Sequence, residues 1–126
     1  MTWDDDKVSA LYYRFETAVP ESLAGIAPDL STGTPVIDMG GTVLAMTWDG
    51  PQTSQTAWSK ATDEYVTTYR RWAHTDDALA GAAVTAAPGL TVLAAGTHVC
   101  EPRITIGTTV TPGRQFTIEA KAPAAP

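Results

Sequence analysis

The fold is decided by the stretch Val36-Ile-Asp-Met-Gly-Gly-Thr-Val-Leu-Ala-Met-Thr-Trp48. Its central pair, Gly40-Gly41, can adopt the positive φ angles that a two-residue hairpin turn requires. In the segment after the turn, Leu44, Met46 and Trp48 fall on one face of a strand, because successive side chains of a strand alternate between its faces. The stretch therefore predicts a β-hairpin with one apolar face.

Strand signals continue toward the carboxy terminus. Residues 82–86, 90–94, 97–106 and 115–120 are expected strands, because they are separated by the turn pairs Pro88-Gly89, Ala95-Gly96 and Pro112-Gly113. Pro102 has no N–H to donate to a ladder, so we expect its strand at a sheet edge or at a bulge. Short strands with a turn about every ten residues are typical of a sandwich or barrel.

The remaining segments are less regular. Asp49-Gly50-Pro51 predicts a turn, and residues 51–62 are expected to be polar and irregular. Residues 63–72 fit a strand with Val66 and Trp72 on one face, and a short helix is the alternative. Residues 4–19 fit helical spacing and strand alternation, and their aromatic and β-branched residues favour a strand. Residues 20–35 predict a loop.

These signals predict a mainly β protein: an antiparallel β-sandwich of about seven strands. At most one short helix is expected, near the amino terminus or within residues 57–70. The length of 126 residues is that of one domain with one core. We assign residues 1–121 to this single domain and residues 122–126 to a flexible tail that has nothing to bury.

Charge and cysteine usage narrow the classes of partner. The chain has a net charge of −6 with eight basic residues, which is too few for a surface that neutralises many phosphates, so no nucleic-acid partner is expected. No apolar run reaches the ~20 residues of a membrane span, and the start is acidic, unlike a signal peptide, so no membrane partner is expected. The single Cys100 excludes an internal disulfide and agrees with a protein made in the cytoplasm.

The one cluster with metal-ligand chemistry is His98, Cys100 and Glu101. His98 and Cys100 share a strand face, but two side chains do not complete a zinc site, and nothing orients the imidazole as a base for a cysteine nucleophile. We therefore predict an inert thiol. The aspartates lack the spacing of a calcium loop, and no phosphate-binding or nucleophile motif occurs. The prediction is a protein that is not an enzyme and needs no cofactor.

Candidate contact residues come from the aromatic and basic side chains. Trp58 lies in a polar stretch that offers no apolar face to bury an indole, which suggests a contact residue. Arg70-Arg71 is the one pair of adjacent basic residues. Trp3 could pack on a neighbouring subunit, or it could act as a staple that holds the first structural element against its own chain. The candidate interface is therefore Trp3, Trp58, Arg70 and Arg71, whereas Trp48 and Trp72 are expected in the core.

The segment Asp76-Asp-Ala-Leu-Ala-Gly-Ala-Ala-Val-Thr85 resembles the Asp-Leu-Thr-Gly-Ala-Thr-Val segment that recurs in β-sandwich modules of phage tails and baseplates. It covers about ten residues and departs from that pattern at Ala80 and Ala83, where threonine is usual. Its glycine is expected to lead a turn into an alternating strand. An alanine- and threonine-rich chain without asparagine is also typical of G+C-rich genomes, such as those of actinobacteria and their phages.

The resemblance implies a structural protein of a bacteriophage virion, in the tail, the head–tail connection or the capsid decoration. Such a protein is made in the host cytoplasm and resides in the virion. Its partners are itself or other virion proteins, joined as a homo-oligomer through repeated interfaces. The expected contact elements are the acidic amino-terminal segment, the loop around Trp58 and the carboxy-terminal tail. The alternative is a carbohydrate- or protein-binding module that uses exposed tryptophans.

Overall fold

The computed structural model describes residues 1–22, 30, 33–106 and 108–123. Strands dominate these residues, and helix is limited to short 3-10 turns at Glu21, Ser22 and Leu30. The prediction of a mainly β protein is therefore confirmed. Most of the loop expected at residues 20–35, and the end of the tail expected at residues 122–126, lie outside the described residues.

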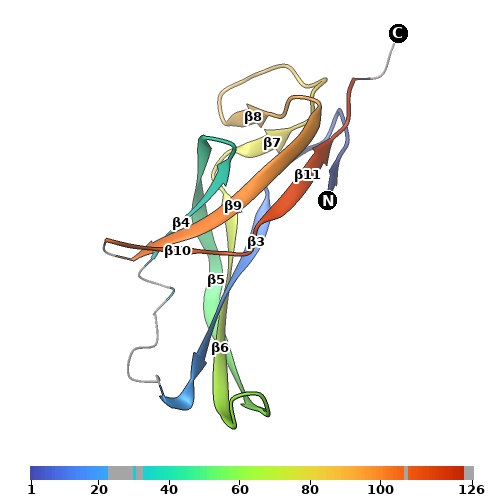
Figure 1. Cartoon of the computed structure of the whole chain (residues 1–126). Helices are drawn as coiled ribbons and strands as arrows, with labels where there is room; N and C mark the ends of the chain where they lie inside the picture. Colours follow the sequence, from blue (N-terminus) through green and yellow to red (C-terminus); the bar gives the residue numbers. More distant parts are fainter. Residues whose placement is uncertain (23–29, 31–32, 107, 124–126) are drawn as a thin grey trace.

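The strands of the described chain follow one another without an intervening helix of regular length (Figure 1). They are β1 (Thr2–Trp3), β2 (Val8–Ser9), β3 (Tyr12–Pro20), β4 (Thr34–Met39), β5 (Thr42–Ser59), β6 (Glu64–Thr75), β7 (Ala78–Ala80), β8 (Leu90–Val92), β9 (Gly96–Ile106), β10 (Thr109–Pro112) and β11 (Phe116–Ala120).

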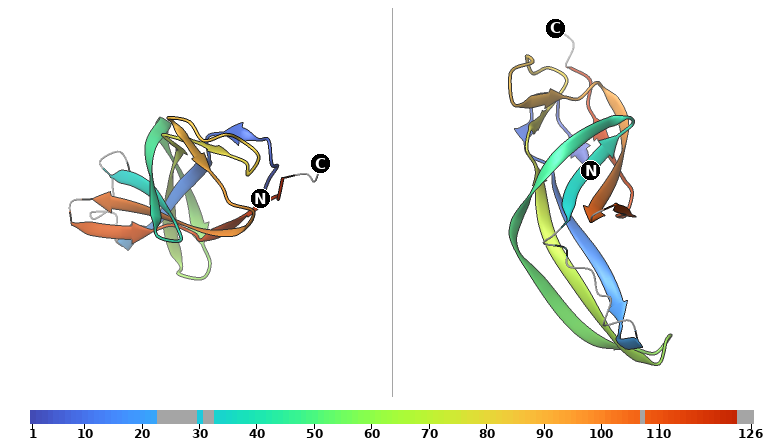
Figure 2. Two further views of the ribbon diagram at one scale, coloured as in Figure 1. Left: turned by 90° about the horizontal axis from the view of Figure 1, so that it is seen from above. Right: turned by 90° about the vertical axis from the view of Figure 1, so that its left-hand side faces the viewer.

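Two sheets make up the molecule. The larger has the order β1-β11-β9-β4-β5-β6-β3, with β10 also paired to β9, and the smaller has the order β2-β7-β8. Strands β1 and β11 are parallel, as are β7 and β8, and the other pairs are antiparallel. The large sheet curls so that its ends approach each other (Figure 2). The expected antiparallel sandwich of about seven strands is not confirmed, because the sheets are mixed and one curled sheet supplies most of the core.

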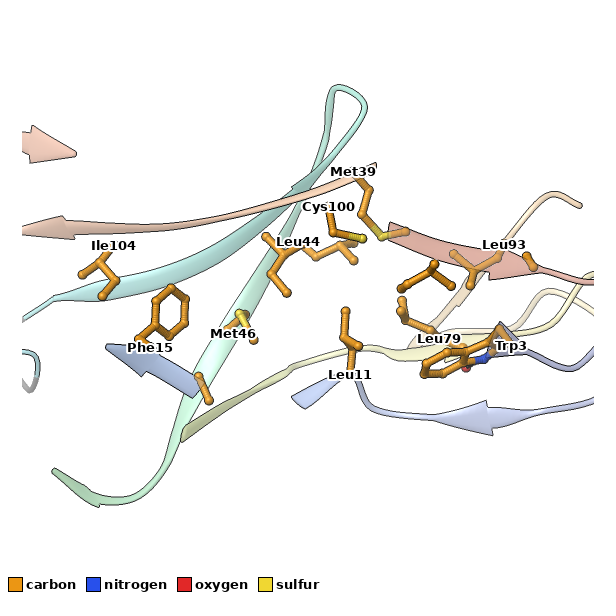
Figure 3. Packing of buried hydrophobic residues seen from close by; sticks show 14 of the residues in the cluster. Trp3, Leu11, Phe15, Met39, Leu44, Met46, Leu79, Leu93, Cys100 and Ile104 are labelled. Carbon is orange, nitrogen blue, oxygen red and sulfur yellow. Dashed lines mark hydrogen bonds between the residues drawn. The ribbon is translucent and has the colours of Figure 1, made fainter. Parts of the chain in front are cut away.

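The core lies inside this curl (Figure 3). Alternate residues of the long strands point inward, and both ends of the chain contribute, through Trp3 on β1 and Ala120 on β11. The buried cluster consists of Trp3, Leu11, Phe15, Leu30, Ile37, Met39, Leu44, Met46, Ala73, Leu79, Leu93, Cys100, Ile104, Ile118 and Ala120.

The hairpin around the glycine pair is confirmed. Met39 pairs with Thr42, and Gly40 and Gly41 have φ angles of 63° and 102°. A side chain is disfavoured at these angles, which is why the pair can close a two-residue turn between β4 and β5. Leu44 and Met46 point into the core, as expected.

The turn predicted at Asp49-Gly50-Pro51 is wrong. Strand β5 continues through this segment to Ser59, and its pairing with β6 shifts register between Asp49 and Thr53. The extra residues form a bulge in which Pro51 needs no ladder partner. The carbonyl of Gly50 instead accepts a hydrogen bond from Arg71 Nε at 2.9 Å. Residues 51–59, expected to be irregular, are therefore part of a strand.

Beyond this bulge the three strands β3, β5 and β6 extend away from the rest of the molecule (Figure 1). We call this extension, residues 17–20, 53–59 and 64–70, the β arm. The strands expected over residues 4–19 and 63–72 are confirmed in β3 and β6, over somewhat different bounds. The helical alternatives for both segments are wrong.

Two further expectations change near the carboxy-terminal half. The strand expected over residues 82–86 is wrong. Strand β7 ends at Ala80, before Gly81, and residues 82–86 are turn and irregular structure. Pro102 lies on β9 between β4 and the β10–β11 side of the sheet, and not at a sheet edge. It stands where the partner of β9 changes from β11 to β10, so its missing N–H falls at a break in the ladder.

Candidate functional site

Two exposed aromatic side chains lie near the end of the β arm. Trp58 and Tyr65 are directly opposite in the β5–β6 register, and their ring centroids are 5.0 Å apart in an edge-to-face arrangement. Trp58 is 51% exposed and Tyr65 is 52% exposed. Cross-strand aromatic pairs stabilise a sheet, and half-exposed aromatics also supply contact area for a partner.

Next to this pair the arm has a hollow. It has a volume of about 290 Å³ and is lined by Val19, Glu21, Thr56, Tyr65, Thr67 and Tyr69. The hydroxyls of Thr56 and Thr67 are 2.9 Å apart and hydrogen-bonded across the two strands. The hollow therefore combines aromatic rings with hydroxyls and one carboxylate.

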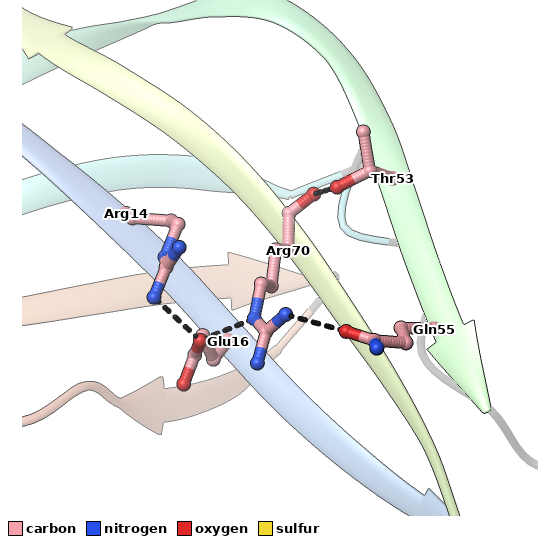
Figure 4. A network of polar contacts seen from close by, with 5 residues as sticks. All are labelled: Arg14, Glu16, Thr53, Gln55 and Arg70. Carbon is pink, nitrogen blue, oxygen red and sulfur yellow. Dashed lines mark hydrogen bonds and ion pairs between the residues drawn. The ribbon is translucent and has the colours of Figure 1, made fainter. Parts of the chain in front are cut away.

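A polar network lies at the base of the β arm, on the sheet face opposite Trp58 and Tyr65 (Figure 4). Glu16 on β3 pairs with Arg70 on β6, whose Nη1 donates to Gln55 on β5 at 3.3 Å, and with Arg14 at 3.1 Å. Each exposed ion pair of this kind contributes at most about 1 kcal/mol. The network links all three strands, so Arg70 is already engaged within its own chain.

The four candidate contact residues are not brought together by the fold. Arg71 lies on the opposite face from Arg70, with its guanidinium 4.9 Å from the ring centroid of Trp48. Trp3 is only 2% exposed, and its Nε1 donates to the Leu79 carbonyl at 3.3 Å. The structure therefore favours the staple role for Trp3, and Trp58 is the candidate that remains prominent on the surface.

The sequence prediction that Trp72 lies in the core is wrong. It was expected in the core, but it is 48% exposed, because even-numbered residues of β6 point away from the curl of the sheet. Trp48 is partly buried against the core and donates from Nε1 to the Gly33 carbonyl at 2.9 Å. Alternation assigned Trp72 to a face correctly, but it cannot say which face is covered.

Tyr65 was missed by the sequence argument. Its place beside Trp58 follows from the hairpin register, which depends on recognising that residues 51–59 are a strand. The signal in the sequence is the polar segment Lys60-Ala-Thr-Asp63, which forms the turn between Ser59 and Glu64.

The His98–Cys100 cluster has an ordinary structural environment. His98 Nε2 lies 2.6 Å from the Ala94 carbonyl, and Cys100 is fully buried. Burial raises the pKa of the Cys100 thiol from 9.0 to about 11, because the thiolate would lose its hydration. Within the described ranges, no three His, Cys, Asp or Glu side chains gather as metal ligands would.

The chain was compared with family models, with curated proteins and with solved structures. None of these comparisons finds a match. Among the described residues, no helix has the length and apolar character needed to span a membrane.

Proposed function

We propose that this protein is a non-enzymatic structural subunit of a bacteriophage particle, and that it assembles through repeated contacts made by its β arm. The observation that carries the proposal is the exposed Trp58–Tyr65 pair at the end of an arm that extends from the molecule (Figure 1). The phage assignment itself rests on the resemblance of residues 76–85 to segments of phage tail and baseplate modules.

The shape of the arm supports a contact role. A three-stranded ribbon that leaves the core buries few apolar side chains of its own, yet it ends in two large aromatics. Aromatic residues dominate the binding energy of protein interfaces, because they bury a large area at a small entropic cost. A subunit with such an arm can reach a neighbour's surface without moving its own core.

The polar network at the base of the β arm supports the same role. Glu16, Arg70 and Gln55 connect the three strands, which resists splaying of the ribbon. A pre-organised contact element loses less entropy on binding than a loose loop does. In a symmetric assembly the same modest contact is repeated around a ring, so that the array is stable although each interface is small.

A second function has its own support in the hollow that Tyr65 and Tyr69 line on the β arm. The Tyr65 and Tyr69 rings line this hollow together with threonine hydroxyls and the Glu21 carboxylate, an arrangement that can stack on a sugar ring and bond its hydroxyls. The alternative is therefore a carbohydrate-binding module, with the same arm as its binding element.

The test is the mass in solution by light scattering over a concentration series, for the wild type and for Trp58→Ala. We expect the wild type to form a defined ring or larger species, and the variant to remain smaller at each concentration. Trp72→Ala is the matched control, because Trp72 is a tryptophan of similar exposure outside the arm.

Unchanged assembly of Trp58→Ala, or a loss caused only by Trp72→Ala, would contradict the role of the arm. A wild type that stays monomeric, and whose tryptophan fluorescence shifts on adding glycans, would favour the carbohydrate-binding function instead. Light scattering and tryptophan fluorescence on the purified wild-type protein thus distinguish assembly from carbohydrate binding.

A further inference from the structure

The large sheet curls without closing into a barrel. Its order places β3 at one end, and at the other end β1 pairs with only the last part of β11, through Glu119 and Ala120. In the part of the chain that the structure describes, no strand pairs with the free side of β3 or with residues 116–118 on the free side of β11. A seam therefore remains between β3 and β11.

Side chains hold the two sides of this seam together. The ring of Tyr13 on β3 stacks on Phe116 of β11, with centroids 5.7 Å apart and planes 9° apart. The Tyr13 hydroxyl accepts a hydrogen bond from the backbone N of Arg114 at 2.8 Å. These side chains thus bridge the seam, while no strand among the described residues pairs with its two backbone edges.

The unpaired backbone groups point into the seam from both sides. Thr75 N donates to the Leu11 carbonyl, so the odd-numbered residues of β3 face β6, and Tyr12, Arg14 and Glu16 direct their N–H and C=O groups outward. On β11, Glu119 N donates to the Met1 carbonyl. By the same alternation Thr117 faces the seam.

An open groove of about 840 Å³ follows the seam. That volume is within the range of ligand-binding sites in proteins. Its lining includes the exposed aromatics Tyr12 and Trp72 and the partly buried aromatics Tyr13 and Phe116. A groove with two free strand edges and aromatic walls is the arrangement that accepts an added β-strand.

The charge of the groove selects the occupant. Arg14 and Arg114 line it with one carboxylate, Glu16, which is already paired with Arg14 and Arg70. The whole chain is acidic, with 14 acidic against 8 basic residues, so this excess of positive charge is local. An acidic segment is attracted to the groove, and a basic one is repelled.

We propose that the groove between β3 and β11 binds an extended acidic segment of another protein as an added β-strand that closes the seam. The backbone edges supply hydrogen bonds, the aromatic side chains cover the apolar residues of the segment, and Arg114 contacts its carboxylates. This site is separate from the end of the β arm, and the proposal does not depend on the arm's function.

The test uses acetylated, amidated peptides of eight residues that alternate glutamate with valine or threonine, titrated into the full chain by calorimetry. One control peptide has lysine in place of each glutamate, and a second is acidic but N-methylated at alternate amides so that it cannot pair as a strand. We expect only the unmodified acidic peptide to bind.

The protein variant for this test is Arg114→Glu. The Arg114 side chain is exposed and only its backbone bonds to Tyr13, so the variant should fold. We expect its affinity for the acidic peptide to fall about tenfold or more. Lys60→Glu at the end of the arm makes the same charge change outside the groove, and its affinity should match the wild type.

Any of four results would overturn the proposal. The acidic peptide could bind no better than the lysine peptide, or equally well when N-methylated. The two charge variants could lose affinity equally, which would indicate a nonspecific effect of net charge. Light scattering could show dimers that Arg114→Glu abolishes and that the acidic peptide does not displace, in which case a second copy occupies the groove.

Discussion

Gly81 sits directly against the backbone that follows β1. A Cβ atom at this position would lie 2.2 Å from the Asp4 carbonyl oxygen and 2.4 Å from backbone atoms of Asp5. The backbone N of Gly81 also donates to the Lys7 carbonyl at 2.8 Å, so the two segments are held at this short separation. The glycine in the segment that resembles phage modules is therefore needed for a close approach between backbones.

Gly81→Ala should destabilise the fold, because a backbone segment must move to make room for the methyl group. We expect a loss of about 3 kcal/mol in the free energy of unfolding, measured by urea denaturation. The control is Gly89→Asn, at a φ of 80° with open space around it, since asparagine tolerates this conformation. Equal stabilities of the two variants would show that the approach at Gly81 is not tight.

The buried Cys100 thiol should make stability depend on pH in the alkaline range. Its folded pKa of about 11 exceeds the ordinary value of 9.0, so the folded state holds the proton more tightly than the unfolded state. Stability from this group is fully present below about pH 9 and is lost as the pH rises toward 11. We expect Cys100→Ala to lose less stability than the wild type between pH 9 and 11, by urea denaturation.

The same burial predicts a thiol that does not react with iodoacetamide in the native protein at pH 8 and reacts fully in urea. Labelling of the native protein at the rate of free cysteine would contradict the burial.

At the scale of elements, β5 shows what local signals can and cannot predict. Its hairpin with β4 was predicted because a glycine pair between two apolar runs specifies a turn locally. Its continuation past Pro51 was not, because a Gly-Pro pair is a turn signal in most contexts. Only the pairing with β6 on the far side of the bulge shows that the strand continues.

The β arm should open more readily than the part of the same strands that lies over the core. Residues 53–59 and 64–69 are mostly exposed or half-exposed, whereas Leu44, Met46, Ala73 and Thr75 are buried. We expect amide hydrogen exchange in the arm to be at least about tenfold faster than in residues 43–47 and 73–75. Uniform protection along β5 and β6 would show that the arm is as stable as the body.

At the scale of the whole molecule, Trp3 joins the two sheets. It lies on β1, which pairs with β11 of the large sheet, and its Nε1 bonds to the Leu79 carbonyl on β7 of the small sheet. The Nζ of Lys7 covers its ring at 4.0 Å from the centroid. The amino-terminal segment, expected to contact neighbours, thus completes the core of its own chain.

Trp3→Ala should weaken the entire fold, because it removes the largest fully buried side chain and the link between the sheets. We expect a loss of about 4 kcal/mol, seen as a lower Tm for the whole cooperative transition. Trp58→Ala, at an exposed site, should change stability by less than about 0.5 kcal/mol. A Trp3→Ala variant as stable as Trp58→Ala would mean that the sheets hold together without this residue.

The sequence by itself determined the β class, the Gly40-Gly41 hairpin and the alternation of faces along β6, because each depends on neighbouring residues and backbone preferences. Tertiary structure alone decided which face of β6 is covered, so that Trp72 is exposed while Trp3 is buried. It also decided the sheet order, the open seam between β3 and β11, and the arm that presents Trp58. These features depend on pairings between strands far apart in the chain, and such pairings leave no local pattern in the residues that make them.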